Sequence, residues 1–153
     1  MEINQKLTDI KFLVGENIII SSKDLSGKKV IIYFYPKDNT PGCTQEAIDF
    51  STNIKKFEKI NTRIIGISKD NFKKHEKFKS KYNLKFALAS DEDGEICGIF
   101  NVWIEKSMYG KKYMGIERST FIFDEKLKLI KSWRNVKVKG HVDEVYNFLS
   151  NKT

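Results

Sequence analysis

The segment that most constrains the fold is an unbroken run of six apolar or aromatic residues, Val30 to Tyr35. Such residues favour strands, and a run without polar alternation is typical of a strand buried on both faces. Pro36 ends the run, because proline cannot donate a hydrogen bond to a neighbouring strand. The sequence therefore predicts a central, fully buried strand that stops at a defined point.

A helix is predicted soon after this strand. Thr40 is a suitable N-cap, and Pro41 is favoured in the first turn of a helix. Four apolar residues recur at spacings of three and four and form one stripe: Ala47, Phe50, Ile54 and Phe57.

The rest of the chain alternates between strand-like and helix-like patterns. We expect an N-terminal hairpin or edge extension around Ile18–Ile20, and later a strand at 64–67, a helix at 72–82, a short strand around Leu88, a short helix at 96–100, a hairpin at 119–123 and 129–133, and a closing helix at 142–149. Residues 103–115 mix glycine, lysine and aromatic residues without a clear period, so we expect a loop there. Helices between strands imply parallel crossovers. The prediction is one α/β domain over residues 1–153, with a mixed central sheet flanked by helices and an N-terminal β extension. The thioredoxin-like fold has this shape.

Composition excludes several classes of protein. Hydrophobic residues make up 40% of the 153 residues and charged residues 31%, as in globular domains. No apolar run approaches the roughly 20 residues that span a bilayer, and no secretory signal is visible, so we expect a cytoplasmic protein without membrane contact. The net charge of +8 is spread over scattered lysines, and no nucleic-acid-binding motif is present. We therefore expect no specific nucleic-acid partner.

The two cysteines, Cys43 and Cys97, are the main candidates for chemistry. Together with His75 and His141 they could supply four metal ligands, but their spacing matches no zinc motif, so no metal or other cofactor is expected. Cys43 stands in the first turn of a predicted helix that follows a central strand. The positive end of the helix favours the thiolate, which is the nucleophilic form of cysteine. The alternative is that Cys43 is an inert buried thiol.

The residues around Cys43 match a known pattern. The run Pro36-x-x-x-Thr40-x-x-Cys43 resembles the active-site motif of peroxiredoxins, and residues 34–47 (FYPKDNTPGCTQEA) are similar to the bacterioferritin comigratory protein (BCP), or PrxQ, subfamily. Matching segments continue along nearly the whole chain, at 25–28, 66–68, 90–94, 102–110 and 115–121. The resemblance implies a thiol-dependent peroxidase with a thioredoxin-like fold.

The resemblance also implies a role for individual residues. Cys43 is similar to the peroxidatic cysteine, which a peroxide oxidises to sulfenic acid. Thr40 resembles the hydroxyl that contacts the peroxide, and Pro36 the residue that screens the pocket. Arg118 corresponds to the arginine that faces the thiolate, although from the sequence alone it would be a surface charge at the start of a strand. Glu46 aligns with a frequent Glu or Gln that supports Arg118 or the loop.

The chain departs from the resemblance at the resolving cysteine. Many PrxQ members carry a second cysteine five residues after the first, where this chain has Ile48, and others carry it in the next helix, where residues 71–82 contain none. Cys97 remains as a possible resolving cysteine, but its neighbours Ile96 and Ile99 favour a core position. We therefore expect a one-cysteine enzyme whose sulfenic acid is reduced by an external thiol, such as thioredoxin, glutaredoxin or a small thiol.

The expected substrates are hydrogen peroxide and alkyl hydroperoxides, and the expected oligomeric state is a monomer or a weak dimer.

The sequence alone leaves other functions open. A two-cysteine peroxidase that uses Cys97 is the first alternative. A thiol–disulfide oxidoreductase would need a second cysteine at position 46, where the chain has Glu. A non-catalytic, basic binding module on the same fold is the remaining alternative.

Overall fold

The computed structural model describes residues 1–151. Seven strands form one sheet: β1 (Lys11–Gly15), β2 (Ile18–Ser21), β3 (Lys29–Phe34), β4 (Thr62–Ser68), β5 (Ala87–Ser90), β8 (Ser119–Phe123) and β9 (Leu129–Trp133). Their order across the sheet is β2-β1-β5-β4-β3-β8-β9. The three strands β3, β4 and β5 run parallel, and the outer pairs are antiparallel. The predicted mixed sheet and the N-terminal β extension are confirmed.

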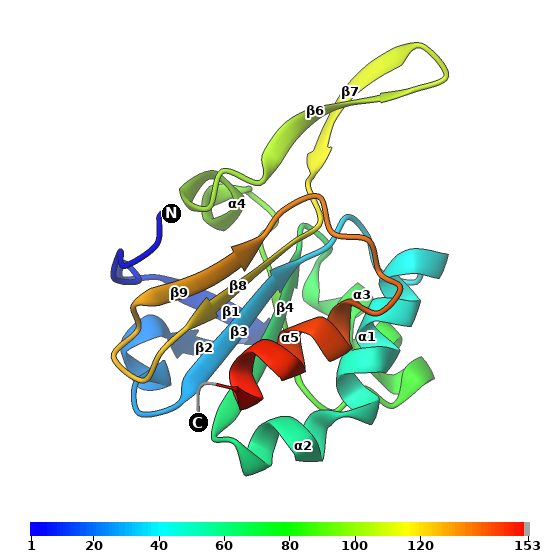
Figure 1. Cartoon of the computed structure of the whole chain (residues 1–153). Helices are drawn as coiled ribbons and strands as arrows, with labels where there is room; N and C mark the ends of the chain where they lie inside the picture. Colours follow the sequence, from blue (N-terminus) through cyan, green and yellow to red (C-terminus); the bar gives the residue numbers. More distant parts are fainter. Residues whose placement is uncertain (152–153) are drawn as a thin grey trace.

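Helices cover both faces of this sheet. They are α1 (Pro41–Thr52), α2 (Ile54–Lys59), α3 (Phe72–Tyr82), α4 (Glu95–Ile99) and α5 (His141–Ser150), with a 3-10 helix at Ser22–Leu25. Side chains of α1, α2, α3 and α5 pack into one core cluster, whereas α4 and the 3-10 helix pack into the other (Figure 1). The sheet therefore separates two hydrophobic cores.

Strand β3 contributes to both cores, as its sequence predicted. Ile31 and Tyr33 face the side of the sheet that carries α1, whereas Val30, Ile32 and Phe34 face the side that carries α4. All of these side chains are fully buried. Full burial on both faces explains why the run has no polar alternation.

The predicted stripe from Ala47 to Phe57 lies on two helices rather than one. The break is at Asn53, whose side chain donates a hydrogen bond to the carbonyl of Asp49 (2.8 Å). A side chain that bonds to the backbone in this way competes with helical hydrogen bonds. Phe57 nevertheless packs into the same core as Phe50, so the apolar residues on both sides of the break face the same layer of the protein.

The expectation of a loop at residues 103–115 is wrong. The segment forms a hairpin of β6 (Trp103–Met108) and β7 (Lys111–Ile116), which projects from the body of the molecule (Figure 1). Both of its faces meet solvent, so its side chains show no alternation of apolar and polar residues. Tyr109 and Gly110 both have positive φ, 52° and 77°, as a two-residue hairpin turn requires. The Tyr-Gly pair is the one signal that pointed to this turn.

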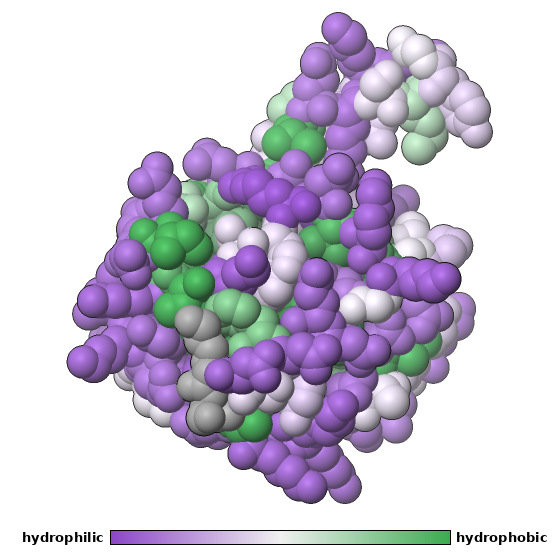
Figure 2. Space-filling model, in the orientation of Figure 1, coloured by the Kyte–Doolittle hydropathy of each residue, from purple (hydrophilic) through white to green (hydrophobic). Residues whose placement is uncertain are grey.

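Over residues 1–151, no helix is both long and apolar enough to cross a bilayer. The face seen in Figure 2 is mainly hydrophilic, with small apolar areas scattered over it. In the same part of the chain, no group of three or more His, Cys, Asp or Glu side chains is placed to hold a metal ion.

Candidate active site

Cys43 lies in the first turn of α1, beyond the C-terminal end of β3. Thr40 is the N-cap residue with extended backbone, and Pro41 is the first helical residue, as the sequence predicted. The Cys43 side chain is 2% exposed and packs into the core on the α1 face of the sheet. The first-turn N–H groups of a helix favour an anion, so this position suits a thiolate.

Arg118 reaches Cys43 because of the strand register. Phe34, the last residue of β3, pairs with Ser119, the first residue of β8, so the preceding Arg118 lies at the end of the sheet where α1 begins. Its Nη2 donates to Cys43 Sγ at 3.3 Å. A Cβ at position 42 would lie 3.3 Å from the same nitrogen, so Gly42 leaves room for the guanidinium. Gly42 is a site residue to which the sequence had given no role.

Glu46 holds the other end of the guanidinium. Arg118 Nη1 donates to Glu46 Oε1 at 2.7 Å, and the Glu46 side chain is fully buried. Burial raises the pKa of Glu46 to about 7, against the opposing influence of Arg118. Burial lowers the pKa of Arg118, but the charges of Glu46 and Cys43 outweigh this and raise it above its usual value. The guanidinium therefore stays charged beside the thiol.

Tyr33 is a further member of the site that sequence reasoning missed. It points from β3 to the same face as Cys43, and its ring lies so close to Gly66 that a Cβ there would be 2.8 Å away. Burial, and then the negative charges of Glu46 and Cys43, raise its pKa well above the usual value. Within residues 1–151, neither Tyr33 Oη nor Glu46 Oε2 has a hydrogen-bond partner. The hydroxyl therefore remains neutral and polar in an otherwise apolar wall.

Thr40 and Pro36 lie in the segment that joins β3 to α1. The Thr40 hydroxyl is half-buried and donates to the carbonyl of Lys37 at 2.9 Å, rather than capping α1 as the sequence allowed. Pro36 is exposed and follows directly after the last buried residue of the β3 run, Tyr35. Both residues belong to one short connection between strand and helix.

A second cation faces the site from the projecting hairpin. Lys106 of β6 pairs with Tyr113, and its side chain packs over Gly115 of β7, where a Cβ would be only 3.2 Å away. Burial lowers the pKa of Lys106, and the charge of Arg118 lowers it further, whereas Cys43 opposes the shift. The hairpin thus places a second positive charge within electrostatic reach of Cys43 and Arg118.

Cys97 belongs to the opposite core. It lies in α4, is fully buried, and packs with the apolar side chains on the side of the sheet away from α1. Burial raises the pKa of the Cys97 thiol, and the neighbouring Asp91 raises it further. The structure therefore places Cys43, Arg118, Glu46 and Thr40 at one end of the sheet and Cys97 in the other layer.

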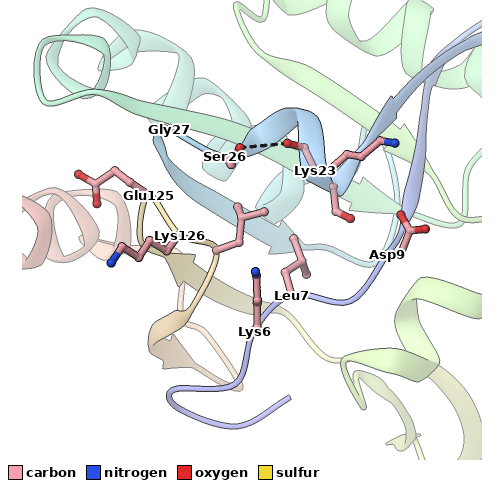
Figure 3. Close-up of a pocket in the computed structure, with 10 residues that line it drawn as sticks. Lys6, Leu7, Asp9, Lys23, Ser26, Gly27, Glu125 and Lys126 are labelled. Carbon is pink, nitrogen blue, oxygen red and sulfur yellow. Dashed lines mark hydrogen bonds between the residues drawn. The ribbon is translucent and has the colours of Figure 1, made fainter.

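A separate surface cavity lies away from this site. A cavity of about 650 Å³ is lined by Lys6, Leu7, Lys23, Gly27, Glu125 and neighbouring residues. Figure 3 shows these side chains around an open depression, with Ser26 Oγ donating to the carbonyl of Lys23. Gly27 precedes β3, so the cavity lies at the end of the sheet opposite Cys43. Cys43 is the candidate thiol because of its chemical surroundings, not because of a pocket.

Comparison with known proteins places this arrangement in a family. Residues 3–132 match the family model described as AhpC/TSA family. The chain is 46% identical over 149 residues to a protein of Bacillus subtilis named Peroxiredoxin Bcp, which covers 97% of this chain and 95% of the relative. The chain belongs to the peroxiredoxins, in the Bcp/PrxQ group. This confirms the resemblance that the motifs carried.

Solved structures support the same conclusion. A cysteine-to-serine variant of PrxQ from Xylella fastidiosa superposes with a TM-score of 0.94 at 36% identity, covering 99% of this chain and 97% of that one. A bacterioferritin comigratory protein of Xanthomonas campestris, described in work on alkyl peroxide reduction, gives 0.88 at 39% identity, with coverage of 94% and 91%. The thioredoxin-like fold is thus confirmed, and the chain is a thiol-dependent peroxidase.

Proposed function

We propose that Cys43 is the peroxidatic cysteine and that Arg118 and Thr40 complete its site, with Pro36 screening the pocket. The observation that carries this proposal is the 3.3 Å contact between Arg118 Nη2 and Cys43 Sγ. A guanidinium at that distance stabilises the thiolate and stays in place to meet an incoming peroxide oxygen. Glu46 supports the same guanidinium from the buried side.

The chemistry follows from this geometry. The Cys43 thiolate attacks the distal oxygen of the peroxide, so an S–O bond forms while the O–O bond breaks. Negative charge moves to the departing oxygen, which takes up a proton and leaves as water or alcohol. In this proposal Arg118 stabilises this charge, and the Thr40 hydroxyl contacts the bound peroxide after turning from the Lys37 carbonyl. Cys43 is left as sulfenic acid, and no metal, flavin or haem is needed for the step.

The proposed substrates are hydrogen peroxide and alkyl hydroperoxides. The Xanthomonas campestris relative is described in terms of alkyl peroxide reduction, and it shares the fold over most of the chain. The apolar and aromatic wall behind Cys43, including Tyr33, is compatible with an alkyl group. We place the protein in the cytoplasm and describe it as a monomer or weak dimer, as the sequence suggested.

We further propose a one-cysteine cycle. An external thiol attacks the sulfenic sulfur of Cys43, forming a mixed disulfide and releasing water, and a second thiol then restores Cys43 and leaves as a disulfide. Thioredoxin, glutaredoxin or a small thiol can fill this role. Support comes from Ile48 at one resolving position, from the absence of cysteine in α3, and from the burial of Cys97 in the other core.

The two-cysteine alternative would require Cys97 to cross the sheet. Both thiols are free and lie in separate cores, so a bond between them demands local unfolding of α1 or α4. The non-catalytic binding module has less support, because the residues of the peroxidase motif are all present and the relatives are named as peroxiredoxins.

Intact mass after one equivalent of hydrogen peroxide, with and without a sulfenic-acid trap, tests the proposal. We expect one trapped adduct on Cys43, with Cys97 free. A loss of two hydrogens without an adduct would establish a Cys43–Cys97 disulfide and a two-cysteine cycle. If neither cysteine reacts within minutes, while salt-sensitive binding to a nucleic acid or protein is found, the binding-module alternative replaces the peroxidase.

A further inference from the structure

A buried polar cluster holds the loop between β3 and α1, and the peroxidase step does not use it. Pro36, Lys37 and Asn39 are exposed, whereas Asp38 is 8% exposed and turned into the protein. A single buried carboxylate in an exposed loop needs partners, because an unpaired charge away from water is costly. The carboxylate has two partners, Tyr35 directly after β3 and His75 of α3.

The main partner of Asp38 is His75 of α3. His75 Nδ1 lies 2.6 Å from Asp38 Oδ2, and Tyr35 donates its hydroxyl hydrogen to Asp38 Oδ1, also at 2.6 Å. The opposite ring nitrogen, His75 Nε2, lies 3.0 Å from the carbonyl oxygen of Ala89 in β5. A carbonyl only accepts, so Nε2 carries a hydrogen, and a further proton lies between Nδ1 and Oδ2. The His75–Asp38 contact is therefore a short hydrogen bond between two buried side chains.

The loop backbone is tied down beside the same contact. Asp38 N donates to Asp70 Oδ2 at 2.9 Å, and this oxygen also accepts from Ser68 Oγ at 2.7 Å. Asn39 Oδ1 accepts from Tyr82 Oη of α3 at 2.9 Å. The loop is therefore attached to α3 at Asp38 and Asn39, and to Asp70, which follows β4.

We propose that His75, acting through Asp38, is a positioning residue for the peroxidase reaction. Thr40 is only two residues beyond Asp38, and its hydroxyl is fixed to the carbonyl of Lys37, one residue before Asp38. The Thr40 carbonyl also accepts from Thr44 N at 2.8 Å in the first turn of α1. The position of the Thr40 hydroxyl relative to the Cys43 thiol therefore depends on where Asp38 is held. This inference rests on the proposed function of Cys43 and Thr40.

The Asp38–His75 pair is better explained by the positions that it fixes than by any net gain in stability. A buried ion pair contributes little net stability compared with well-packed apolar residues, but it fixes the positions of the groups that it joins. A reacting group misplaced by about 1 Å costs on the order of 10²-fold in rate. Loss of the His75 contact should therefore affect the reaction with peroxide more than it affects the thiol itself.

The test compares two reactions of the same thiol in a Cys97→Ala background, so that only Cys43 reports. One is oxidation by hydrogen peroxide in a stopped-flow instrument, and the other is reaction with a small aromatic disulfide, which needs the thiolate but not the peroxide pocket. The variants are His75→Phe, which removes both ring hydrogen bonds, and His75→Asn, whose amide can still donate to Asp38. Asn71→Ala is the matched control, because Asn71 caps α3 through Lys74 N (2.9 Å) without touching the loop.

We expect His75→Phe to slow oxidation by peroxide about ten- to hundredfold while the disulfide reaction changes less than about threefold. His75→Asn should recover part of the loss, and Asn71→Ala should match the parent in both reactions. If His75→Phe does not fold, Asp38→Asn supplies the same comparison.

The inference is overturned if the folded variants oxidise within twofold of the parent, or if Asn71→Ala slows oxidation as much as His75→Phe. It is also overturned if both reactions of Cys43 fall together, which would indicate loss of the thiolate. Failure of the parent protein itself to react with peroxide would instead refute the proposed function.

Discussion

The two cysteines of this chain lie on opposite faces of one sheet, and their surroundings differ in a single decisive respect. Burial does not separate them, because Cys43 is 2% exposed and Cys97 is fully buried. Cys43 accepts a hydrogen bond from the guanidinium of Arg118, whereas Cys97 has the carboxylate of Asp91 as its neighbour. One thiol faces a positive charge and the other a negative charge.

This contrast gives the two thiols of one fold opposite electrostatic surroundings. A nearby cation favours the thiolate, and a nearby anion disfavours it. Asp91 is itself held in place, since its two carboxylate oxygens accept from the backbone N–H groups of Ile96 and Cys97 at the start of α4. The carboxylate that caps α4 also raises the pKa of the Cys97 thiol within that helix.

Replacing each cysteine in turn gives the largest expected effect. Cys43→Ser should lower peroxide consumption by at least about 10³-fold, because it removes the nucleophile. Cys97→Ala should leave the rate within about twofold and cost about 1 kcal/mol of unfolding free energy through lost packing. Steady-state peroxide assays with an external thiol, together with urea unfolding, measure both. A large loss of turnover in Cys97→Ala would break the comparison, since Cys97 would then take part in the cycle.

Removing the cation beside Cys43 gives the next effect. Arg118→Ala should lower the second-order rate with peroxide by about 10²- to 10³-fold, because it removes a donor aimed at developing charge. Arg134→Ala is the matched control, because it removes an equal positive charge at a residue that pairs with Glu117 at 2.8 Å and does not touch Cys43. We expect that control to react within about twofold of the parent. Equal losses in both variants would show that the rate depends on general charge rather than on the contact with the thiol.

Glu46, which pairs with Arg118, should make the unfolding free energy depend on pH. Because burial raises the pKa of Glu46 from 4.5 to about 7, the folded protein holds a proton that the unfolded chain releases. Unfolding free energy should therefore fall as pH rises from about 4.5 to about 7, by up to about 3 kcal/mol. Glu46→Gln cannot lose that proton, so its stability should rise relative to the wild type over the same range. Chemical denaturation of both proteins at several pH values tests this, and parallel curves would contradict it.

Parts of this molecule were predictable from local sequence. The apolar run of β3, its end at Pro36, and the start of α1 at Thr40 and Pro41 are all marked by neighbouring residues, and the structure confirms them. The β6–β7 hairpin was not predictable in the same way, because both of its faces meet solvent and its alternation is lost. Its only local mark is the Tyr-Gly turn.

The contacts of the site also differ in whether the sequence could predict them. Thr40 and Cys43 lie within one short segment, so the sequence itself showed that they are neighbours. Arg118 approaches Cys43 only because Phe34 pairs with Ser119, a register that composition and periodicity do not reveal. The partnership of Asp38 with His75 joins residues 37 positions apart in the chain and had no sequence signal. Contacts set by strand register or by helix docking require the structure.

The smallest expected effect concerns Cys97 and its neighbour Asp91. Asp91→Asn removes the negative charge near Cys97 while keeping an oxygen that can accept one of the two backbone N–H groups. The pKa of Cys97 should fall, but burial is the larger cause of its elevation and remains in place. Alkylation of Cys97 at pH 9 should therefore rise by about tenfold or less, as measured by mass spectrometry in a Cys43→Ser background. If Cys97 then reacted as fast as an exposed thiol, charge alone would control the two cysteines, and the burial that they share would play no part.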